Sequence, residues 1–156
     1  MEIERLYNHP DKMGDAAEMI YDEFVSKKEN SKTLEEVQVQ FVDGDETTFP
    51  MRFIALKGEE SIGTVSLVEN DLAVRPDCTP WLASLVVKSD YRSHGVGKQL
   101  LAETKKLTKS LGYKELYLRT ETAAEYYKKN GWTYIETTSD DTFDEIHVFK
   151  VTLDEM

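Results

Sequence analysis

Glycines and basic side chains gather where an expected strand gives way to an expected helix. Residues 81–87 form an almost continuous apolar run, which is typical of a strand buried on both faces. After a short loop, apolar residues recur at helical spacing through residues 95–111. The first N–H groups of a helix have no partner within it, and glycine lets a ligand approach the backbone, so the turn between them could hold a phosphate or pyrophosphate. The turn consists of Arg92, Ser93, His94, Gly95, Val96, Gly97 and Lys98.

Arg92 and Lys98 would add positive charge at the rim of such a site. Between Lys88 and Lys114, seven basic residues and two acidic ones give a net charge of +5, whereas the whole chain carries −11. A local basic stripe on an acidic protein favours one anionic ligand, although a solvated lysine-rich helix face has the same composition. The overall charge argues against a nucleic-acid surface, because attraction to many phosphates needs broad basic clusters.

The elements that would position this turn form a mixed α/β fold, expected as a single domain over residues 1–156. Alternating or continuous apolar stretches predict about seven strands, and apolar spacing of three to four residues predicts about four helices. Tight turns are expected at residues 43–45 and 58–61. The expected strands are 1–7, 51–57, 62–68, 81–87, 113–119, 132–137 and 145–153, and the expected helices are 10–28, 34–42, 95–111 and 122–130.

Length and composition exclude several classes of protein. A chain of 156 residues is the usual size of one domain. No stretch approaches the roughly 20 apolar residues of a membrane-spanning helix, and the N-terminus lacks the order of a secretion signal. The one cysteine, Cys78, cannot form an internal disulfide and is expected to be a loop residue without a catalytic role. We therefore expect a cytoplasmic protein that makes no membrane contact.

Two segments, in this order, resemble one known family. Arg92-x-x-Gly95-x-Gly97 is similar to the Arg/Gln-x-x-Gly-x-Gly/Ala signature of the GNAT superfamily of coenzyme A-dependent N-acyltransferases, and residues 85–91 resemble the strand that leads into it. Downstream, residues 123–132 resemble the family's Ala-x-x-aromatic-Tyr-x-Lys-x-Gly-aromatic segment. The strong resemblance covers about residues 80–135, and the preceding residues match only in the order of their elements.

The resemblance implies a GNAT fold in which parallel strands four and five splay apart and admit the pantetheine arm of acetyl-CoA. Backbone groups along Leu85, Val86 and Val87 would then pair with pantetheine. The N–H groups of residues 93–98 would hold the pyrophosphate. Further coenzyme contacts are implied for Lys129 and for Thr120, which replaces the family's frequent asparagine but keeps a hydroxyl donor and acceptor.

The same resemblance implies that Tyr127 is the general acid that protonates the departing thiolate. A phenol with an ordinary pKa near 10 is protonated at neutral pH and can donate. Packing at the domain edge is a second possible role for this side chain. Tyr126 is turned by about 100° around the helix and is expected to pack inward.

No general base can be fixed from the sequence. Some family members place a glutamate at the start of the central strand, where this chain has Trp81, which cannot accept a proton. A chain of water molecules could relay the proton instead. Carboxylates near loops could also accept it, although each of them is equally explained as solvated surface. The candidates near loops are Glu69, Asp71 and Glu121, and Asp22 and Glu23 on the first expected helix could face the amine as well.

These observations favour an N-acetyltransferase that acts on a primary amine and binds no metal. Its acidic character would favour a cationic acceptor, a longer acyl-CoA stays open as the donor, and the family commonly forms homodimers. A non-catalytic acyl-CoA-binding module is the second hypothesis. A nucleotide-binding protein is disfavoured, because Lys98-Gln99 follows Gly97 where a phosphate-binding loop would have Gly-Lys-Ser/Thr. No metal site is expected from His9, His94 and His147, which lie apart in the sequence.

Overall fold

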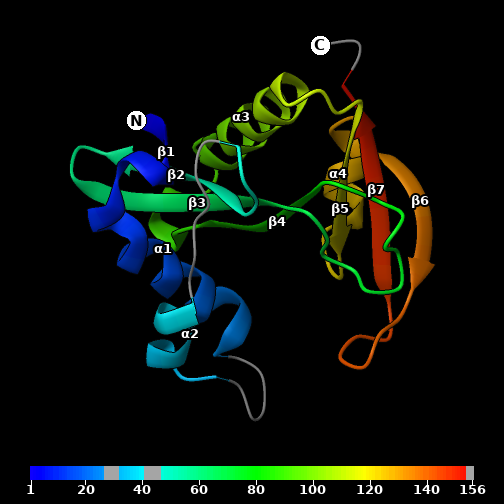
Figure 1. The fold of residues 1–156 in the computed structure, drawn as a ribbon, viewed down its shortest axis with the longest axis horizontal. Coiled ribbons are helices and arrows are strands. Elements are labelled where there is room, and N and C mark those ends of the chain that lie inside the picture. Colours follow the sequence, from blue (N-terminus) through cyan, green and yellow to red (C-terminus); the bar gives the residue numbers. More distant parts are fainter. Residues whose placement is uncertain (27–31, 41–46, 154–156) are drawn as a thin grey trace. The chain divides into compact units, whose positions relative to one another are not determined.

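The computed structural model describes residues 1–26, 32–40 and 47–153 (Figure 1). Seven strands form one mixed sheet in the order β1-β2-β3-β4-β5-β7-β6. The pairs β1–β2, β2–β3, β5–β7 and β7–β6 are antiparallel, and β4–β5 is parallel. This confirms the expected mixed sheet with a parallel pair at strands four and five.

The observed elements lie where the sequence predicts them, and most ends shift by one or two residues. Residues 41–46, with the turn expected at 43–45, lie outside the described part of the chain. The strands are β1 (Glu2–Arg5), β2 (Met51–Lys57), β3 (Glu60–Val68), β4 (Trp81–Val87), β5 (Glu115–Thr120), β6 (Thr133–Thr138) and β7 (Ile146–Thr152). The α-helices are α1 (Met13–Ile20), α2 (Leu34–Gln40), α3 (Val96–Ser110) and α4 (Ala124–Lys129).

The first helical segment differs from the single α-helix that the sequence predicts over residues 10–28. It begins as a 3-10 turn over Pro10–Lys12, continues as α1, and ends as a π-helix over Tyr21–Val25. The wider turn closes where the Ser26 N–H donates to the Tyr21 carbonyl five residues earlier, at 2.9 Å. Apolar spacing of three to four residues fits both kinds of helix, so the sequence pattern does not reveal the change.

Contacts divide the chain into two compact units, each with an apolar core of its own. The first unit comprises Met1–Leu67 and Ser84–Thr104, and the second comprises Val68–Ala83 and Lys105–Met156. In the first unit, α1 and β2 pack with the end of β4 through Leu6, Ala16, Met19, Ile54, Leu56 and Val86. In the second unit, the loop before β4 packs on β7 through Leu72, Cys78, Trp81, Ile146 and Val148.

Trp81 anchors the start of β4 in the second unit. Its side chain is fully buried, and its indole N–H donates to the Cys78 carbonyl at 2.7 Å. The parallel ladder with β5 pairs Trp81 with Tyr117 and Leu82 with Leu118. Beside it, β7 lies between β5 and β6 (Figure 1). Trp81 is therefore a core residue, and full burial of an indole is among the largest single contributions to a core.

None of the helices in the described ranges combines the length and apolar character needed to cross a membrane.

Candidate active site

The end of β4 leads directly into the glycine turn. Within this strand Ser84 has a positive φ of 53°, which is uncommon for a residue other than glycine and interrupts the regular extended backbone. The Val86 side chain is buried in the core of the first unit, whereas Leu85 and Val87 are partly buried. Val86 could therefore meet a ligand only through its backbone groups.

The turn before α3 has the backbone geometry of an anion site. Ser93 and Gly95 both have positive φ values, 69° and 82°. Left-handed residues in a turn of this kind can direct successive backbone N–H groups toward one point, where an anion can bind. The Gln99 N–H donates to the Gly95 carbonyl at 3.1 Å, which is a hydrogen bond of α-helical spacing at the start of α3. The preceding N–H groups of residues 96–98 belong to the first turn, where a helix offers no acceptor of its own. A Cβ on Gly95 would meet no atom within 4 Å, so the space above the turn is open.

Arg92 fastens this turn to the strand before it. Its Nε donates to the Val87 carbonyl at 2.9 Å, and its Nη2 lies 3.5 Å from Glu23 Oε2 on the π-helix. The side chain is about half exposed. His94 and Lys98 are exposed on the same turn. The guanidinium thus combines a structural contact with a weak ion pair that an incoming anion could replace.

Gly63 on β3 supports the start of α3, a role that the sequence alone did not reveal. A Cβ at this position would stand 3.1 Å from the Val86 carbonyl oxygen, 3.2 Å from Leu100 and 3.3 Å from Val96. By contrast, a Cβ on Gly97 would meet only Val87, at an ordinary 3.9 Å. A glycine inside a strand is the available sequence signal for such close packing.

In the second unit, the residues after β5 form a short turn into α4. The Thr120 hydroxyl oxygen accepts a hydrogen bond from the Ala123 N–H at 3.0 Å, so it organises the turn and still has its own proton to donate. Thr120 is buried, and Lys129 is exposed at the end of α4.

Tyr127 of α4 points into the core of the second unit. Its ring lies 5.9 Å from that of Trp132 and 6.2 Å from that of Phe149, and the side chain is 9% exposed. Burial, with a smaller contribution from the neighbouring Tyr126, raises the pKa of Tyr127 to about 12. The expectation that Tyr126 packs inward is wrong, because that side chain is 41% exposed. The core contacts select Tyr127 as the inward residue of this six-residue helix.

An open pocket of about 380 Å³ lies beside the start of α4. It is lined by residues 121–126 and by His147 of β7, all within the second unit. Glu121 and Glu125 give the lining two carboxylates, and Tyr126 adds an exposed phenol. The two carboxylates and the exposed aromatic ring suit a cationic ligand.

Next to this pocket, one guanidinium gathers three acidic residues. Arg119 Nη1 donates to the Asp71 backbone carbonyl at 3.3 Å and to Asp140 Oδ2 at 3.4 Å, and Nη2 lies 3.7 Å from Glu121 Oε1. Its guanidinium carbon also stands 5.6 Å from the centre of the Phe143 ring. Burial raises the pKa of Asp71 to about 6, with Arg119 opposing the rise and Glu121 adding to it.

The remaining carboxylates considered as bases are less favourably placed. Glu23 is committed to Arg92, and Asp22 and Glu69 are exposed. Within the ranges that the structure describes, no three His, Cys, Asp or Glu side chains are grouped to hold a metal ion.

Comparison with known proteins identifies the family. The Acetyltransferase (GNAT) domain family matches residues 51–134, which include β4, the glycine turn, α3, β5 and α4. The chain belongs to the GNAT acetyltransferase family. It is therefore an acyltransferase, as the resemblance of residues 92–97 implied. No curated protein sequence matches the chain.

Solved GNAT structures share the whole fold. An aminoglycoside 6'-N-acetyltransferase complexed with coenzyme A superposes with a TM-score of 0.74 at 17% identity, over 98% of this chain and 97% of that one. An acetyltransferase from Streptococcus agalactiae gives 0.68 at 20% identity, over 97% and 98%. An acyl-CoA N-acyltransferase from Pseudomonas aeruginosa gives 0.66 at 15% identity, over 96% and 97%. At these identities the likeness concerns the fold.

Proposed function

We propose that this GNAT protein is an N-acetyltransferase that moves the acetyl group of acetyl-CoA to a primary amine. The observation that carries the proposal is the turn at residues 93–98, which combines two left-handed residues with the open start of α3 in a chain of this family. We propose further that residues 1–156 make up one catalytic domain, in which β4 and α3 supply residues to both compact units.

The residues of the turn fit the coenzyme. The N–H groups of Val96, Gly97 and Lys98 would hold the pyrophosphate, and backbone groups of Leu85 and Val87 would pair with pantetheine. The Val87 carbonyl already accepts from Arg92 and keeps its second lone pair for the ligand. When bound, acetyl-CoA supplies the thioester carbonyl and the thiolate leaving group.

Tyr127 would act on the leaving sulfur mainly as a neutral hydrogen-bond donor. With its pKa raised to about 12, the phenol stays protonated throughout the physiological range. Full transfer of its proton to a thiolate of ordinary basicity, with a pKa near 8.5, would be uphill. A hydrogen bond that strengthens as negative charge develops on the sulfur needs no such transfer and still stabilises the transition state.

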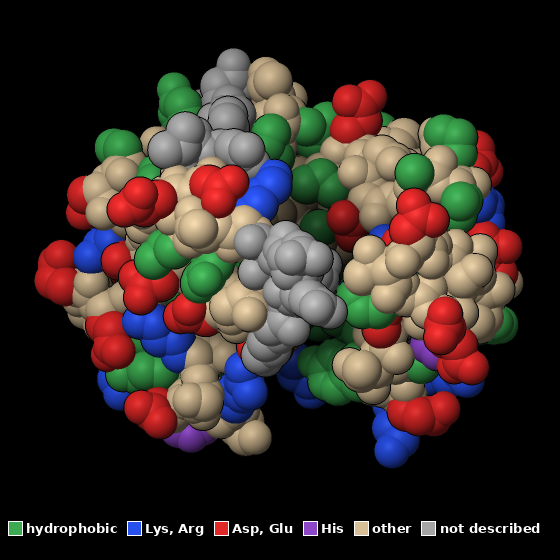
Figure 2. All heavy atoms as spheres, turned by 90° about the horizontal axis from the view of Figure 1, so that it is seen from below, with side chains coloured by type: hydrophobic (Ala, Val, Ile, Leu, Met, Phe, Trp, Pro, Cys, Tyr) green, Lys and Arg blue, Asp and Glu red, His purple; other side chains and the backbone are tan. Residues whose placement is uncertain are grey.

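The acceptor we propose is a cationic primary amine. The net charge of −11 and the acidic side chains spread over the face drawn in Figure 2 (red) favour the approach of cations. The pocket beside α4 adds Glu121 and Glu125 at a place where an ammonium group could bind. One of the structural relatives is an aminoglycoside acetyltransferase, which agrees with a polycationic acceptor.

Calorimetry with acetyl-CoA and a thiol-release assay together test the proposal. We expect binding of acetyl-CoA but not of ATP, and thiol release with at least one of spermidine, kanamycin A and a lysine amide. A protein without affinity for acetyl-CoA would contradict the coenzyme assignment. Binding without turnover on any of these amines would instead favour a non-catalytic acyl-CoA-binding module, and faster turnover with a longer acyl-CoA would change the donor.

A further inference from the structure

We infer that Asp71, in the loop between β3 and β4, is the residue that accepts the proton from the acceptor's ammonium group. This inference rests on the proposed function and adds the general base that the sequence leaves open. It follows from how the structure holds the loop, how it leaves the carboxylate without an ionic partner of its own, and how Arg119 contacts both the Asp71 backbone and Glu121, which lines the acidic pocket.

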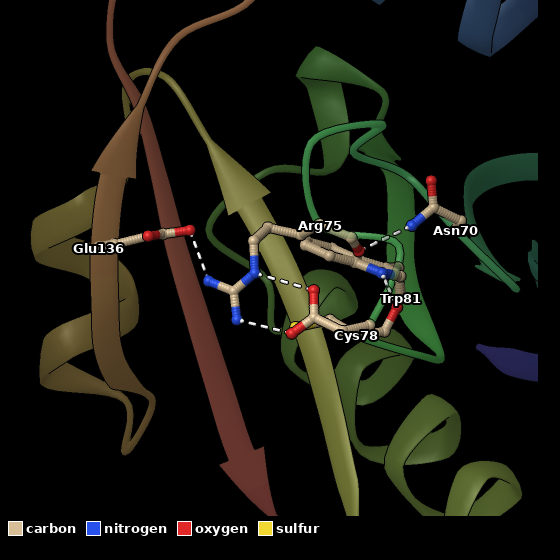
Figure 3. Close-up of polar contacts among 6 residues, drawn as sticks. Asn70, Arg75, Cys78, Trp81 and Glu136 are labelled. Atoms are coloured by element: carbon tan, nitrogen blue, oxygen red, sulfur yellow. Dashed lines mark hydrogen bonds and ion pairs between the residues drawn. The ribbon is translucent and has the colours of Figure 1, made fainter.

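The loop around Asp71 is fixed by contacts on both sides. Arg75 bonds Glu136 of β6 at 2.5 Å and Asp77 at 3.1 Å, and the Asn70 amide donates to the Arg75 carbonyl at 3.1 Å (Figure 3). The Arg75 N–H in turn donates to the carbonyl of Leu72, whose side chain is buried in the core of the second unit. Asp71 therefore stands between two anchored neighbours, which is the preorganisation that a catalytic group needs.

Arg119 holds the backbone of Asp71 and leaves its carboxylate free to react. The guanidinium donates to the Asp71 carbonyl oxygen, whereas it meets Asp140 and Glu121 through their carboxylates. Among the described residues, none donates a hydrogen bond to the Asp71 carboxylate. With all three acids ionised, one positive charge faces three negative charges, so the acid that is most buried and least paired takes up a proton most readily.

The titration of Asp71 agrees with this arrangement. Burial raises its pKa to about 6, while Arg119 lowers it in part and Glu121 raises it. An aspartate with an ordinary pKa near 4 is a weaker base by a factor of about 100. At pH 7.5 most of the Asp71 carboxylates would still be ionised and ready to accept a proton.

Glu121 connects Asp71 to the pocket. It belongs both to the Arg119 cluster and to the pocket lining, and its charge acts on the Asp71 carboxyl, so an ammonium group attracted to Glu121 would enter the electrostatic surroundings that it shares with Asp71. The ammonium would lose one proton to Asp71. The freed nitrogen lone pair would then form the N–C bond to the thioester carbon, the C–S bond would break with its electron pair on sulfur, and the second nitrogen proton would pass to the thiolate.

The test compares Asp71→Asn with Asp140→Asn. The second substitution removes another negative charge beside the same Arg119 guanidinium. With acetyl-CoA and the fastest of spermidine, kanamycin A and lysine amide, we expect Asp71→Asn to lower kcat/KM for the amine about 100-fold. Its KM for acetyl-CoA should stay within twofold. The acidic limb near pH 6 in the kcat/KM profile should disappear in Asp71→Asn and persist in Asp140→Asn.

Each outcome bears on one assignment. If the wild type acetylates an amine and Asp71→Asn keeps its activity within a few fold or retains the acidic limb, Asp71 is not the base. If Asp140→Asn loses activity and the limb to the same extent, the cluster acts only as a structural unit and the assignment fails. If the wild type acetylates none of the amines, the proposed function itself falls. Titration of the carboxyl carbons by NMR adds an independent check, since an Asp71 signal with an ordinary pKa would also overturn the inference.

Discussion

The Tyr127 phenol combines a buried ring with a hydroxyl that stays protonated. The rings of Trp132 and Phe149 pack near the Tyr127 ring, and burial of the side chain is the larger cause of its raised pKa. Such a residue loses its proton with difficulty, so the role that we propose for it is that of a neutral hydrogen-bond donor. Its contribution to the reaction should therefore appear in turnover much more than in the affinity for either substrate.

Tyr127→Phe should lower kcat by roughly 10- to 100-fold, because it removes a donor that acts on charge formed in the transition state. The dissociation constant for acetyl-CoA, measured by calorimetry, should change little. Tyr126→Phe is the matched control, since that phenol is exposed on the same helix and should keep near wild-type turnover. Equal turnover in the two variants would leave Tyr127 with packing as its only role.

Asp71→Asn should also change the dependence of stability on pH. A carboxyl whose folded pKa is raised binds its proton more tightly in the folded state, so its charge destabilises the fold as pH rises from about 4 through about 6. That difference corresponds to at most about 3 kcal/mol. Urea unfolding should show Asp71→Asn close to wild type at pH 4 and more stable at pH 7.5. A variant less stable than wild type at pH 7.5 would contradict the buried, unpaired carboxylate.

At the scale of elements, two glycines near the start of α3 have different roles: Gly63 allows close packing, and we propose that Gly97 allows contact with the ligand. Gly63 faces backbone and side chains at 3.1–3.3 Å, whereas Gly97 has room for a methyl group in the protein alone. Gly63→Ala should destabilise the fold by about 1–3 kcal/mol, as overpacking does. Gly97→Ala should stabilise α3 by up to about 1 kcal/mol and still weaken acetyl-CoA binding, because the methyl group would stand where the pyrophosphate approaches. Thermal unfolding and calorimetry on both variants measure the two effects, and unimpaired binding by Gly97→Ala would place the pyrophosphate elsewhere.

The sequence predicts elements well where periodicity alone determines them. Alternation places β5 and β7 within two residues, and the apolar run of residues 81–87 coincides with β4. The π-helix at residues 21–25 was missed because the four-residue spacing from Ile20 to Phe24 also fits an α-helical turn. The inward choice between Tyr126 and Tyr127 was also wrong, since it depends on Trp132 and Phe149, which a helix of six residues does not predict from its own spacing.

The candidate site was predictable where it lies on one continuous segment. The turn at residues 92–98 could be proposed as a coenzyme site from Gly95, Gly97 and the helix that follows them. Arg119 contacts Asp71 across 48 positions of the sequence, and Arg75 contacts Glu136 across 61 positions. Asp71 could therefore be named from sequence only as one of five carboxylates, and its separation from the rest required the fold.

At the scale of the whole molecule, each compact unit is assembled from two separate stretches of chain. The boundaries fall after Leu67, Ala83 and Thr104. A fragment of residues 105–156 would contain β5, β7 and β6 but would lack Leu72, Cys78 and Trp81, which complete its core. We expect this fragment alone to show no cooperative unfolding by circular dichroism, and a cooperative transition would contradict this prediction.

The interleaved course of the chain also limits how this protein can be recombined. A single crossover after residue 104, the last boundary between the two units, would join β5 and β7 from one parent to the residue 68–83 segment of another. Trp81 would then have to fit foreign partners at Tyr117, Ile146 and Val148. Chimeras that exchange residues 68–83 together with residues 105–156 should keep the core of the second unit from a single parent. Chimeras between GNAT relatives are therefore better designed with three junctions than with one.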